Sequence, residues 1–343
     1  MSKSFSLFIT LFFLLLAAGA RPAAATDLKI ATVVPANSAW MVAMRHGADA
    51  IRQRTDGRVN LKFYPGGVMG NDQSVLRKIR IGQLQGGAFT AGGLGKVCPD
   101  LGLYSFPLLF RSQQEIAFVR GRRDALLQEE LKQAGFISYG FAQGGFALLM
   151  SDRPVRTLDD LTGQKIWVPE GDAVSYRTME ALGLAPVSLP ITDVMTGLET
   201  GLVSIVASSP VGAVAFQWYT RVKYLTDLPV SYIYGTLALD RRAVERLEPA
   251  DQQVLQEVMT GIYRDFDNKS REDNEAARQA MLAQGLTVIV PQTAEAATWR
   301  EKAAGLARQL STEGLYSSQF FHDVAQDLKD YRSGQRGLAA STN

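Results

Sequence analysis

The chain has 343 residues, of which 46% are hydrophobic and 20% charged, and its formal net charge is +2 at pH 7. This length fits about two domains, and the composition is typical of globular proteins that bury a core in each. A near-neutral chain without a basic run gives no support to nucleic-acid binding. The single cysteine, Cys98, excludes an internal disulfide.

The N-terminus is typical of a secretory signal peptide, which we assign to residues 1–25. Lys3 supplies positive charge, residues 5–18 form an apolar run, and residues 23–25 are alanines suited to cleavage. An uncleaved membrane anchor is the alternative, but the apolar run is short for a bilayer span. Cleavage removes Lys3 and Arg21 and no acidic residue, so the mature chain would have a net charge of zero.

The first part of the mature chain alternates strand and helix patterns, which predicts a parallel sheet with helices on its faces. Asn71 or Asp72 is a suitable cap for the second helix, and residues 143–145, Gln-Gly-Gly, indicate a crossing between two lobes. The expected strands lie at residues 28–34, 59–64, 83–89 and 136–142, and the expected helices at 39–54, 72–81 and 113–134.

A second α/β unit follows, and then a long helix. The expected strands lie at residues 165–168, 186–189, 203–207 and 286–290, with two strand-like runs in 224–240 and helices at 173–182 and 193–200. A helix over about 250–284 would be roughly 50 Å long and would span both lobes. Two helices should begin near Thr293 and Tyr316, and the polar tail 333–343 is expected to be disordered.

These patterns divide the mature chain into two lobes. Residues 26–145 with about 235–265 would form lobe I, and residues 146–234 with about 285–330 would form lobe II.

No residue pattern indicates catalysis. The two histidines, His46 and His322, are far apart in the chain, and no nucleophile elbow, phosphate loop or paired metal-binding histidine motif is present. Cys98 has no local signature of a nucleophile and is expected to be a small buried side chain. We therefore expect no enzyme activity, no metal and no cofactor.

Five motifs in order resemble the DctP-like substrate-binding proteins of tripartite ATP-independent periplasmic (TRAP) transporters, over roughly residues 28–310. They are Pro-Ala-Asn-Ser-Ala-Trp at 35–40, Tyr-Pro-Gly-Gly-Val-Met-Gly at 64–70, Phe-Pro-Leu-Leu-Phe at 106–110, Gly-Phe at 145–146 and Gly-Gln-Lys-Ile-Trp-Val-Pro at 163–169. The resemblance implies an α/β periplasmic binding protein-like fold: two lobes with a ligand cleft, crossing strands and one long inter-lobe helix. It also implies periplasmic capture of a small molecule, lobe closure and delivery to TRAP-type integral membrane subunits.

The chain departs from that family where the ligand binds. Arginines of the family motifs are replaced by Ala147 and Trp167, and an asparagine is replaced by Ser209 in Ser-Ser-Pro at 208–210. An arginine holds a carboxylate with two charge-assisted hydrogen bonds, and a buried carboxylate without that partner is unstable. The departures therefore predict a neutral, substantially hydrophobic ligand.

The resemblance and the positions of aromatic and polar side chains yield one set of candidate ligand-binding residues. They are Trp40, Asp72, Phe89, Phe146, Ala147, Trp167, Ser208, Ser209 and Trp218. Trp40 and Trp218 fit equally well as packing residues, and Phe89 as a strand terminus.

Three alternatives stay open. Aromatic rings, with Tyr232 among them, could cage a quaternary ammonium balanced by Asp72, Glu170 or Asp172. Arg153, Arg156 or Arg177 could replace the lost arginines and bind an organic acid. The protein could also be a carrier or sensor that hands its ligand to a tetratricopeptide-type periplasmic partner.

Overall fold

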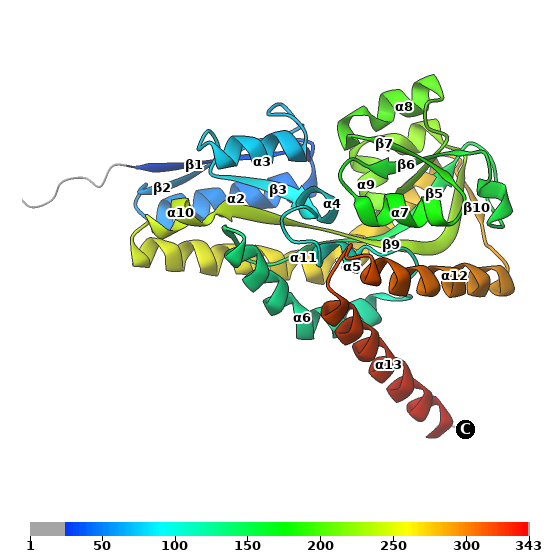
Figure 1. The fold of residues 1–343 in the computed structure, drawn as a ribbon. Coiled ribbons are helices and arrows are strands. Elements are labelled where there is room, and N and C mark those ends of the chain that lie inside the picture. The colour runs from blue at the N-terminus through cyan, green and yellow to red at the C-terminus, as the bar shows by residue number, and fades with distance from the viewer. Residues whose placement is uncertain (1–24, 342–343) are drawn as a thin grey trace, which may run out of the picture.

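The computed structural model describes residues 25–341, with side chains described through residue 334, so the predicted signal peptide lies outside the described residues except for its last position. Across this part of the chain the strands form one sheet of ten, in the order β2-β1-β3-β9-β5-β8-β6-β7, with β4 and β10 paired to β9. Two α/β lobes are built at the two ends of this sheet, and helices cover both (Figure 1).

The first lobe follows the predicted alternation closely, because its helices begin at side-chain caps. Ser38 and Asn71 each accept a hydrogen bond from a backbone N–H in the first turn of the helix that follows. Its strands are β1 (Thr26–Thr32), β2 (Val59–Tyr64), β3 (Gly86–Thr90) and β4 (Phe136–Ser138). Its helices are α2 (Ala39–Arg54), α3 (Asp72–Arg80), α4 (Ala91–Leu94), α5 (Leu101–Tyr104), α6 (Gln113–Gln133) and α10 (Arg241–Glu245).

Two long strands, β5 (Ala142–Ser151) and β9 (Tyr224–Asp240), cross between the lobes. They pair antiparallel with each other, and β9 is also antiparallel to β3, so the whole sheet is mixed. Strands β1, β2 and β3 pair in parallel, as the alternation in the first part of the chain predicted. The pairing of β5 with β9 shifts between Gln143 and Gly145. The two strand-like runs predicted within 224–240 are one continuous strand that passes through Pro229.

The second lobe repeats the strand and helix alternation on the other half of the sheet. Its strands are β6 (Lys165–Pro169), β7 (Ala185–Leu189), β8 (Ile205–Ser208) and β10 (Thr287–Ile289). Its helices are α7 (Ala173–Ala181), α8 (Val194–Thr200), α9 (Pro210–Ala215) and α12 (Thr293–Thr312). The lobe boundaries predicted at residues 145 and 234 stay predictions. They fall at the β5 irregularity and where β9 begins to pair with β3, at Gly235.

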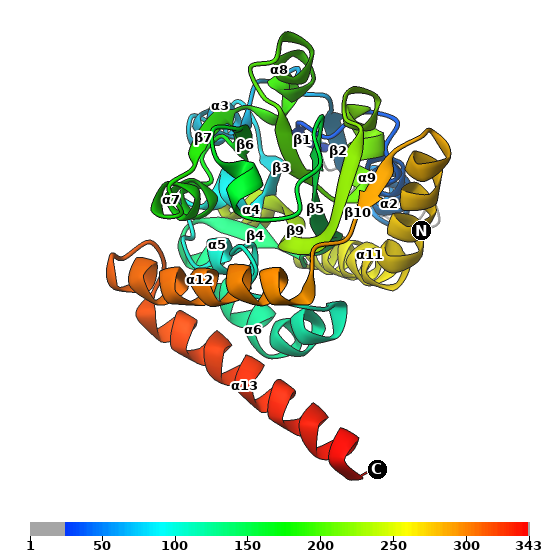
Figure 2. The same ribbon diagram turned by 90° about the vertical axis from the view of Figure 1, so that its right-hand side faces the viewer.

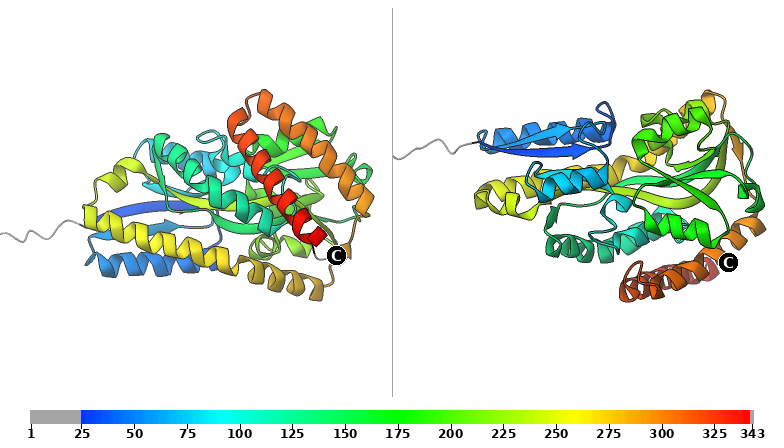
Figure 3. Two further views of the ribbon diagram at one scale, coloured as in Figure 1. Left: turned by 90° about the horizontal axis from the view of Figure 1, so that it is seen from below. Right: turned by 45° about the horizontal axis from the view of Figure 1, so that its top comes forward.

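The predicted long helix is α11 (Pro249–Ala283), which has 35 residues and begins with proline in its first turn. It contacts α2 of the first lobe and α9 of the second, and runs along both when the molecule is viewed from below (Figure 3). Helix α11 therefore spans the lobes, as the sequence predicted.

The C-terminal helix α13 (Ser318–Ser341) continues into residues 333–343, for which the sequence predicted a disordered tail, and that disorder stays a prediction. It leads away from the end of α12 (Figure 2) and is tied to α6 by ion pairs of Asp327 with Arg122 and Arg123, at 2.9 and 2.6 Å. A helix that is already nucleated by such packing gains one hydrogen bond for each added residue, so a polar sequence can extend it. Residues 342 and 343 lie outside the described part.

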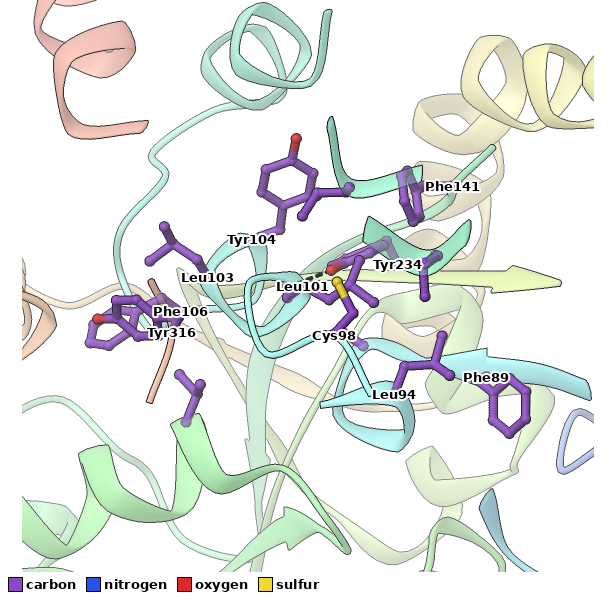
Figure 4. Packing of buried hydrophobic residues seen from close by; sticks show 14 of the residues in the cluster. Phe89, Leu94, Cys98, Leu101, Leu103, Tyr104, Phe106, Phe141, Tyr234 and Tyr316 are labelled. Atoms are coloured by element: carbon purple, nitrogen blue, oxygen red, sulfur yellow. Dashed lines mark hydrogen bonds between the residues drawn. The ribbon is translucent and has the colours of Figure 1, made fainter. Parts of the chain in front are cut away.

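The largest core cluster among the described residues surrounds α5 and α6 of the first lobe and also takes in side chains of α12 and α13. Tyr104 and Phe106 are fully buried there, and Tyr234 donates a hydrogen bond at 2.5 Å to the carbonyl of Leu101 (Figure 4). Cys98 is buried in the same cluster, as expected. This core packs against β3 and β9 beside the inter-lobe region.

Candidate functional site

A cavity of about 390 Å³ lies between the lobes and extends into the second. Its walls come from the end of β3 and the start of α3 in lobe I, from β6 and α9 in lobe II, and from the crossing strands. Eight of the nine predicted ligand-binding residues line it. They are Trp40, Asp72, Phe89, Ala147, Trp167, Ser208, Ser209 and Trp218.

Phe146 does not line the cavity, although the sequence predicted that it would. Its ring instead packs edge-on against Tyr232, at a centroid distance of 5.7 Å, beside the lobe I core. Successive side chains of a strand point to opposite faces, and the neighbouring Ala147 faces the cavity. A sequence motif can locate the strand but cannot establish which of two neighbours faces the ligand.

Trp167 and Trp218 build an aromatic wall. Both are buried, and their rings meet edge to face with centroids 5.0 Å apart. Phe216 stacks on Trp218 at 5.3 Å. The indole N–H of Trp167 donates to the carbonyl of Leu189 at 3.0 Å. Trp167 therefore offers apolar ring surface to the cavity, while its one donor is used by the protein.

Ser208, the last residue of β8, and Ser209, which follows it, are also engaged in internal hydrogen bonds. Ser208 Oγ donates to the carbonyl of Ser209, and Ser209 Oγ accepts from the backbone N–H of Gly212 at 3.2 Å, which caps α9. Asn274 of α11 donates to the carbonyl of Gly144 and accepts from Val211 N–H. These polar groups hold the crossing strands, α9 and α11 together, and they offer few free donors to a ligand.

Four acidic residues line the cavity. Glu170 and Asp273 are exposed, whereas Asp72 and Asp172 are half-buried. Burial raises the pKa of Asp72 to about 7, because its carboxyl is packed against Gly93; a Cβ on that glycine would lie 2.0 Å from Asp72 Oδ2. Hydrogen bonds from Thr90 oppose this rise only in part. Burial also raises the pKa of Asp172, which caps α7 by accepting from Ser175 N–H.

No lysine, arginine or histidine is found among the described residues that line the cavity. Arg153 and Arg156 are exposed, and Arg177 forms an ion pair with Glu313 at 3.1 Å on the surface. Arg120 lies behind the lining, where it donates to Tyr232 Oη and pairs with Asp267. None of the three arginines suggested as substitutes therefore reaches the cavity.

An inner chamber extends the cavity into lobe II, and sequence reasoning did not find it. It is lined by Leu149, Leu158, Leu161, Leu184 and Trp299, which come together from β5, the segment before β6, the start of β7 and α12. These residues belong to, or pack against, one apolar cluster. In the sequence they are indistinguishable from core residues, because no local pattern separates the wall of a cavity from a filled core.

The histidines and the cysteine of the described residues do not line the cavity. No cluster of three or more potential metal ligands occurs within residues 25–334, and His46 and His322 are both exposed. Cys98 donates to Glu130 at 3.1 Å, and burial raises the pKa of its thiol, so the reactive thiolate is disfavoured. Within the same range, no helix combines the length and hydropathy needed to cross a membrane.

Known proteins resemble this chain over most of its length. It is 26% identical over 254 residues to the C4-dicarboxylate-binding periplasmic protein DctP of Rhodobacter capsulatus, covering 72% of this chain and 75% of that protein. It is 22% identical over 211 residues to the uncharacterized protein YiiZ of Salmonella typhimurium, covering 60% of this chain but only 64% of that protein, under two thirds of its length.

Solved structures show the same fold. The sugar acid binding protein DctPAm from Advenella mimigardefordensis, in complex with galactonate, superposes with a TM-score of 0.83 at 20% identity, covering 89% of this chain and 98% of that chain. The family model for bacterial extracellular solute-binding proteins of family 7, DctP, matches residues 30–313, which confirms the resemblance inferred from the motifs. Because this match spans well over half of the chain, the protein belongs to the DctP family of bacterial extracellular solute-binding proteins.

Proposed function

We propose that the protein is a periplasmic receptor that captures a neutral or largely hydrophobic small molecule in the inter-lobe cavity and delivers it to TRAP-type membrane subunits. One observation carries the proposal. The described lining combines an aromatic and aliphatic surface with four acidic residues and no cationic side chain.

The energetics of this lining disfavour a carboxylate ligand. A charge-assisted hydrogen bond contributes about 1.5–3 kcal/mol, and an arginine supplies two. Here Ala147 and Trp167 supply none, and the carboxyl groups of Asp72 and Glu170 would repel an anion. The ligands of the related proteins named above are a C4-dicarboxylate and galactonate, so we infer a different ligand class for this chain.

Contacts across the mouth of the cavity support capture by lobe closure. Asn71 at the start of α3 donates a hydrogen bond to Glu170, which follows β6. Nearby, Gly92 lies so close to Asp172 that a Cβ on the glycine would be 2.9 Å from Asp172 Cβ. A ligand held behind these contacts would be released when the lobes separate, as delivery to a membrane subunit requires.

A quaternary ammonium ligand is the second candidate, because the same lining places aromatic rings and carboxyl groups around one cavity. An indole face attracts such a cation by about 0.5–2 kcal/mol. The two candidates differ in their response to pH. As pH rises, ionisation of Asp72 would strengthen the binding of a cation. The same ionisation would weaken the binding of a neutral ligand, because the ligand would cover a charged carboxylate.

The test is native mass spectrometry of protein purified from its own periplasm, followed by organic extraction and identification of what co-purifies. A retained neutral, lipid-like molecule supports the proposal, and a retained quaternary amine selects the second candidate. A retained small carboxylate overturns both.

Delivery needs its own test, in which the protein is reconstituted with TRAP-type membrane subunits and the extracted ligand. Ligand-dependent uptake is expected, and uptake that proceeds without this protein would contradict the assignment. Transfer to a tetratricopeptide-type partner, the alternative stated above, has no supporting observation among the described residues or the related proteins. Neighbouring genes that encode such a repeat protein and no membrane subunit would favour it.

A further inference from the structure

Two short helices of lobe I, α4 and α5, lie on the side that faces α7 of lobe II (Figure 1), and each approaches it through a glycine. A Cβ added to Gly92 of α4 would lie 2.9 Å from Cβ and 3.2 Å from Cα of Asp172, which caps α7. A Cβ added to Gly102 of α5 would lie 2.8 Å from Val174 Cγ2. Carbon atoms in contact are ordinarily about 3.5–4.0 Å apart, so neither position has space for a side chain in this arrangement of the lobes.

The partner of Gly102 is buried in the core of the opposite lobe. Val174 is 5% exposed and belongs to the apolar cluster of lobe I, together with Leu101 and Leu103, and to neither of the two clusters of its own lobe. Separation of the lobes would expose this side chain to water. Because burial of a valine side chain is favourable, its contact with Gly102 stabilises the closed arrangement.

The backbone does not explain why these two positions carry glycine. Gly92 and Gly102 lie within helices, and neither has a positive φ. Alanine is the better helix former, so each helix carries the residue that stabilises it less. Gly67 shows the contrast. It also approaches lobe II, where its Cβ would lie 2.8 Å from Thr192 Cγ2, but its φ of +73° already favours glycine.

We propose that Gly92 and Gly102 are the closure contacts of this receptor, where the missing side chains let lobe II close onto lobe I. Gly102 does not line the cavity, so its effect on binding would act entirely through the position of the lobes. The inference rests on the part of the proposed function in which the lobes close on a ligand. It goes further by naming the residues that set the balance between the closed and the separated lobes.

The experiment measures the shape of the full mature chain by small-angle X-ray scattering, with protein purified from its own periplasm. Wild type should match the scattering of the closed arrangement, whereas Gly92→Ala and Gly102→Ala should each have a larger radius of gyration. Gly95→Ala is the matched control at the end of α4, because its Cβ would come no closer than 3.4 Å to any atom. This control should scatter like wild type.

A second substitution separates closure from damage to α5. Val174→Ala removes Cγ2, and the nearest atom that remains, Cβ of residue 174, would be 3.8 Å from the new Cβ at position 102. Gly102→Ala combined with Val174→Ala should therefore be more compact than Gly102→Ala alone. Asp172→Ala should not rescue Gly92→Ala in the same way, because the atoms that collide there are the Cβ and the backbone of residue 172.

Binding provides a second measurement. Overpacking at a closure contact should lower the apparent affinity for the fluorescent probe N-phenylnaphthylamine by about tenfold or more in both glycine variants and leave it unchanged in Gly95→Ala. Thermal unfolding establishes that each variant is folded.

Glycine variants as compact as wild type would overturn the inference, and so would a wild type that scatters like separated lobes. Glycine variants that open in a protein that retains a small carboxylate would leave the inference intact and overturn the proposed ligand class. The two failures are therefore distinguishable.

Discussion

Replacement of Asp72 by asparagine should stabilise the protein at neutral pH and leave its stability unchanged in acid. The carboxyl group is packed against Gly93 and accepts a 3.3 Å hydrogen bond from Thr90 Oγ1, so burial raises its pKa from 3.8 to about 7. Asparagine keeps the shape and one acceptor oxygen but carries no charge at any pH.

The sign and size of the stability difference between Asp72→Asn and wild type follow from proton linkage. Between about pH 4 and pH 7 the folded state holds a proton that the unfolded chain has already released, so the stability of the wild type falls as pH rises. The rise in pKa corresponds to roughly three powers of ten in proton affinity, at about 1.4 kcal/mol each. The stability of Asp72→Asn relative to wild type should therefore increase by up to about 4 kcal/mol across this range and remain constant above it. Because water has partial access to the Asp72 carboxyl, the measured stability difference should be smaller than this upper value.

The assay is urea unfolding of both proteins at a series of pH values. Asp160→Asn is the matched control with the opposite sign. Backbone N–H groups of Arg156 and Thr157 hold the pKa of Asp160 below its ordinary value, so its removal should destabilise the protein at neutral pH and have no effect in acid. A stability difference for Asp72→Asn that does not change with pH, or that changes like the control, would refute the reasoning.

Two further predictions concern the aromatic wall and the crossing strand. Trp167→Ala should lower the free energy of unfolding by about 3–5 kcal/mol, because it leaves a cavity beside Trp218. Trp167→Phe loses mainly the hydrogen bond of the indole N–H and should lower it by about 1 kcal/mol. Equal losses for the two variants in urea unfolding would contradict this prediction. Gly145→Ala should destabilise more than Gly163→Ala. Both glycines have positive φ, +91° and +74°, with an intrinsic cost of about 1–2 kcal/mol. Only at Gly145 would the new Cβ collide, 2.6 Å from Asn274, and indistinguishable melting temperatures for the two variants would show that this contact is unimportant.

Much of the fold was predictable because local signals agree with the tertiary structure. Ser38 and Asn71 cap helices that begin at the next residue, and α11 starts and ends within about one residue of its predicted limits. The alternation of the two α/β units placed the strands of the mature chain approximately, except β5, of which only Ala142 fell within a predicted strand. Less predictable were the antiparallel pairing of β5 with β9, which joins residues 73 to 93 positions apart, and the docking of α13 through Asp327.

Some features of the candidate site were likewise predictable from the sequence, and others were not. The sequence alone determined that positions 147 and 167 carry alanine and tryptophan where the family resemblance implies arginines, because residue identity at a motif position is local information. Only the tertiary structure decided that Phe146 turns away, that no arginine stands among the described residues of the cavity lining and that Asp72 is pressed against Gly93. The inner chamber also emerges only there. The physical reason is that burial, charge neighbours and hydrogen-bond partners are properties of groups brought together by folding, and no single stretch of chain encodes them.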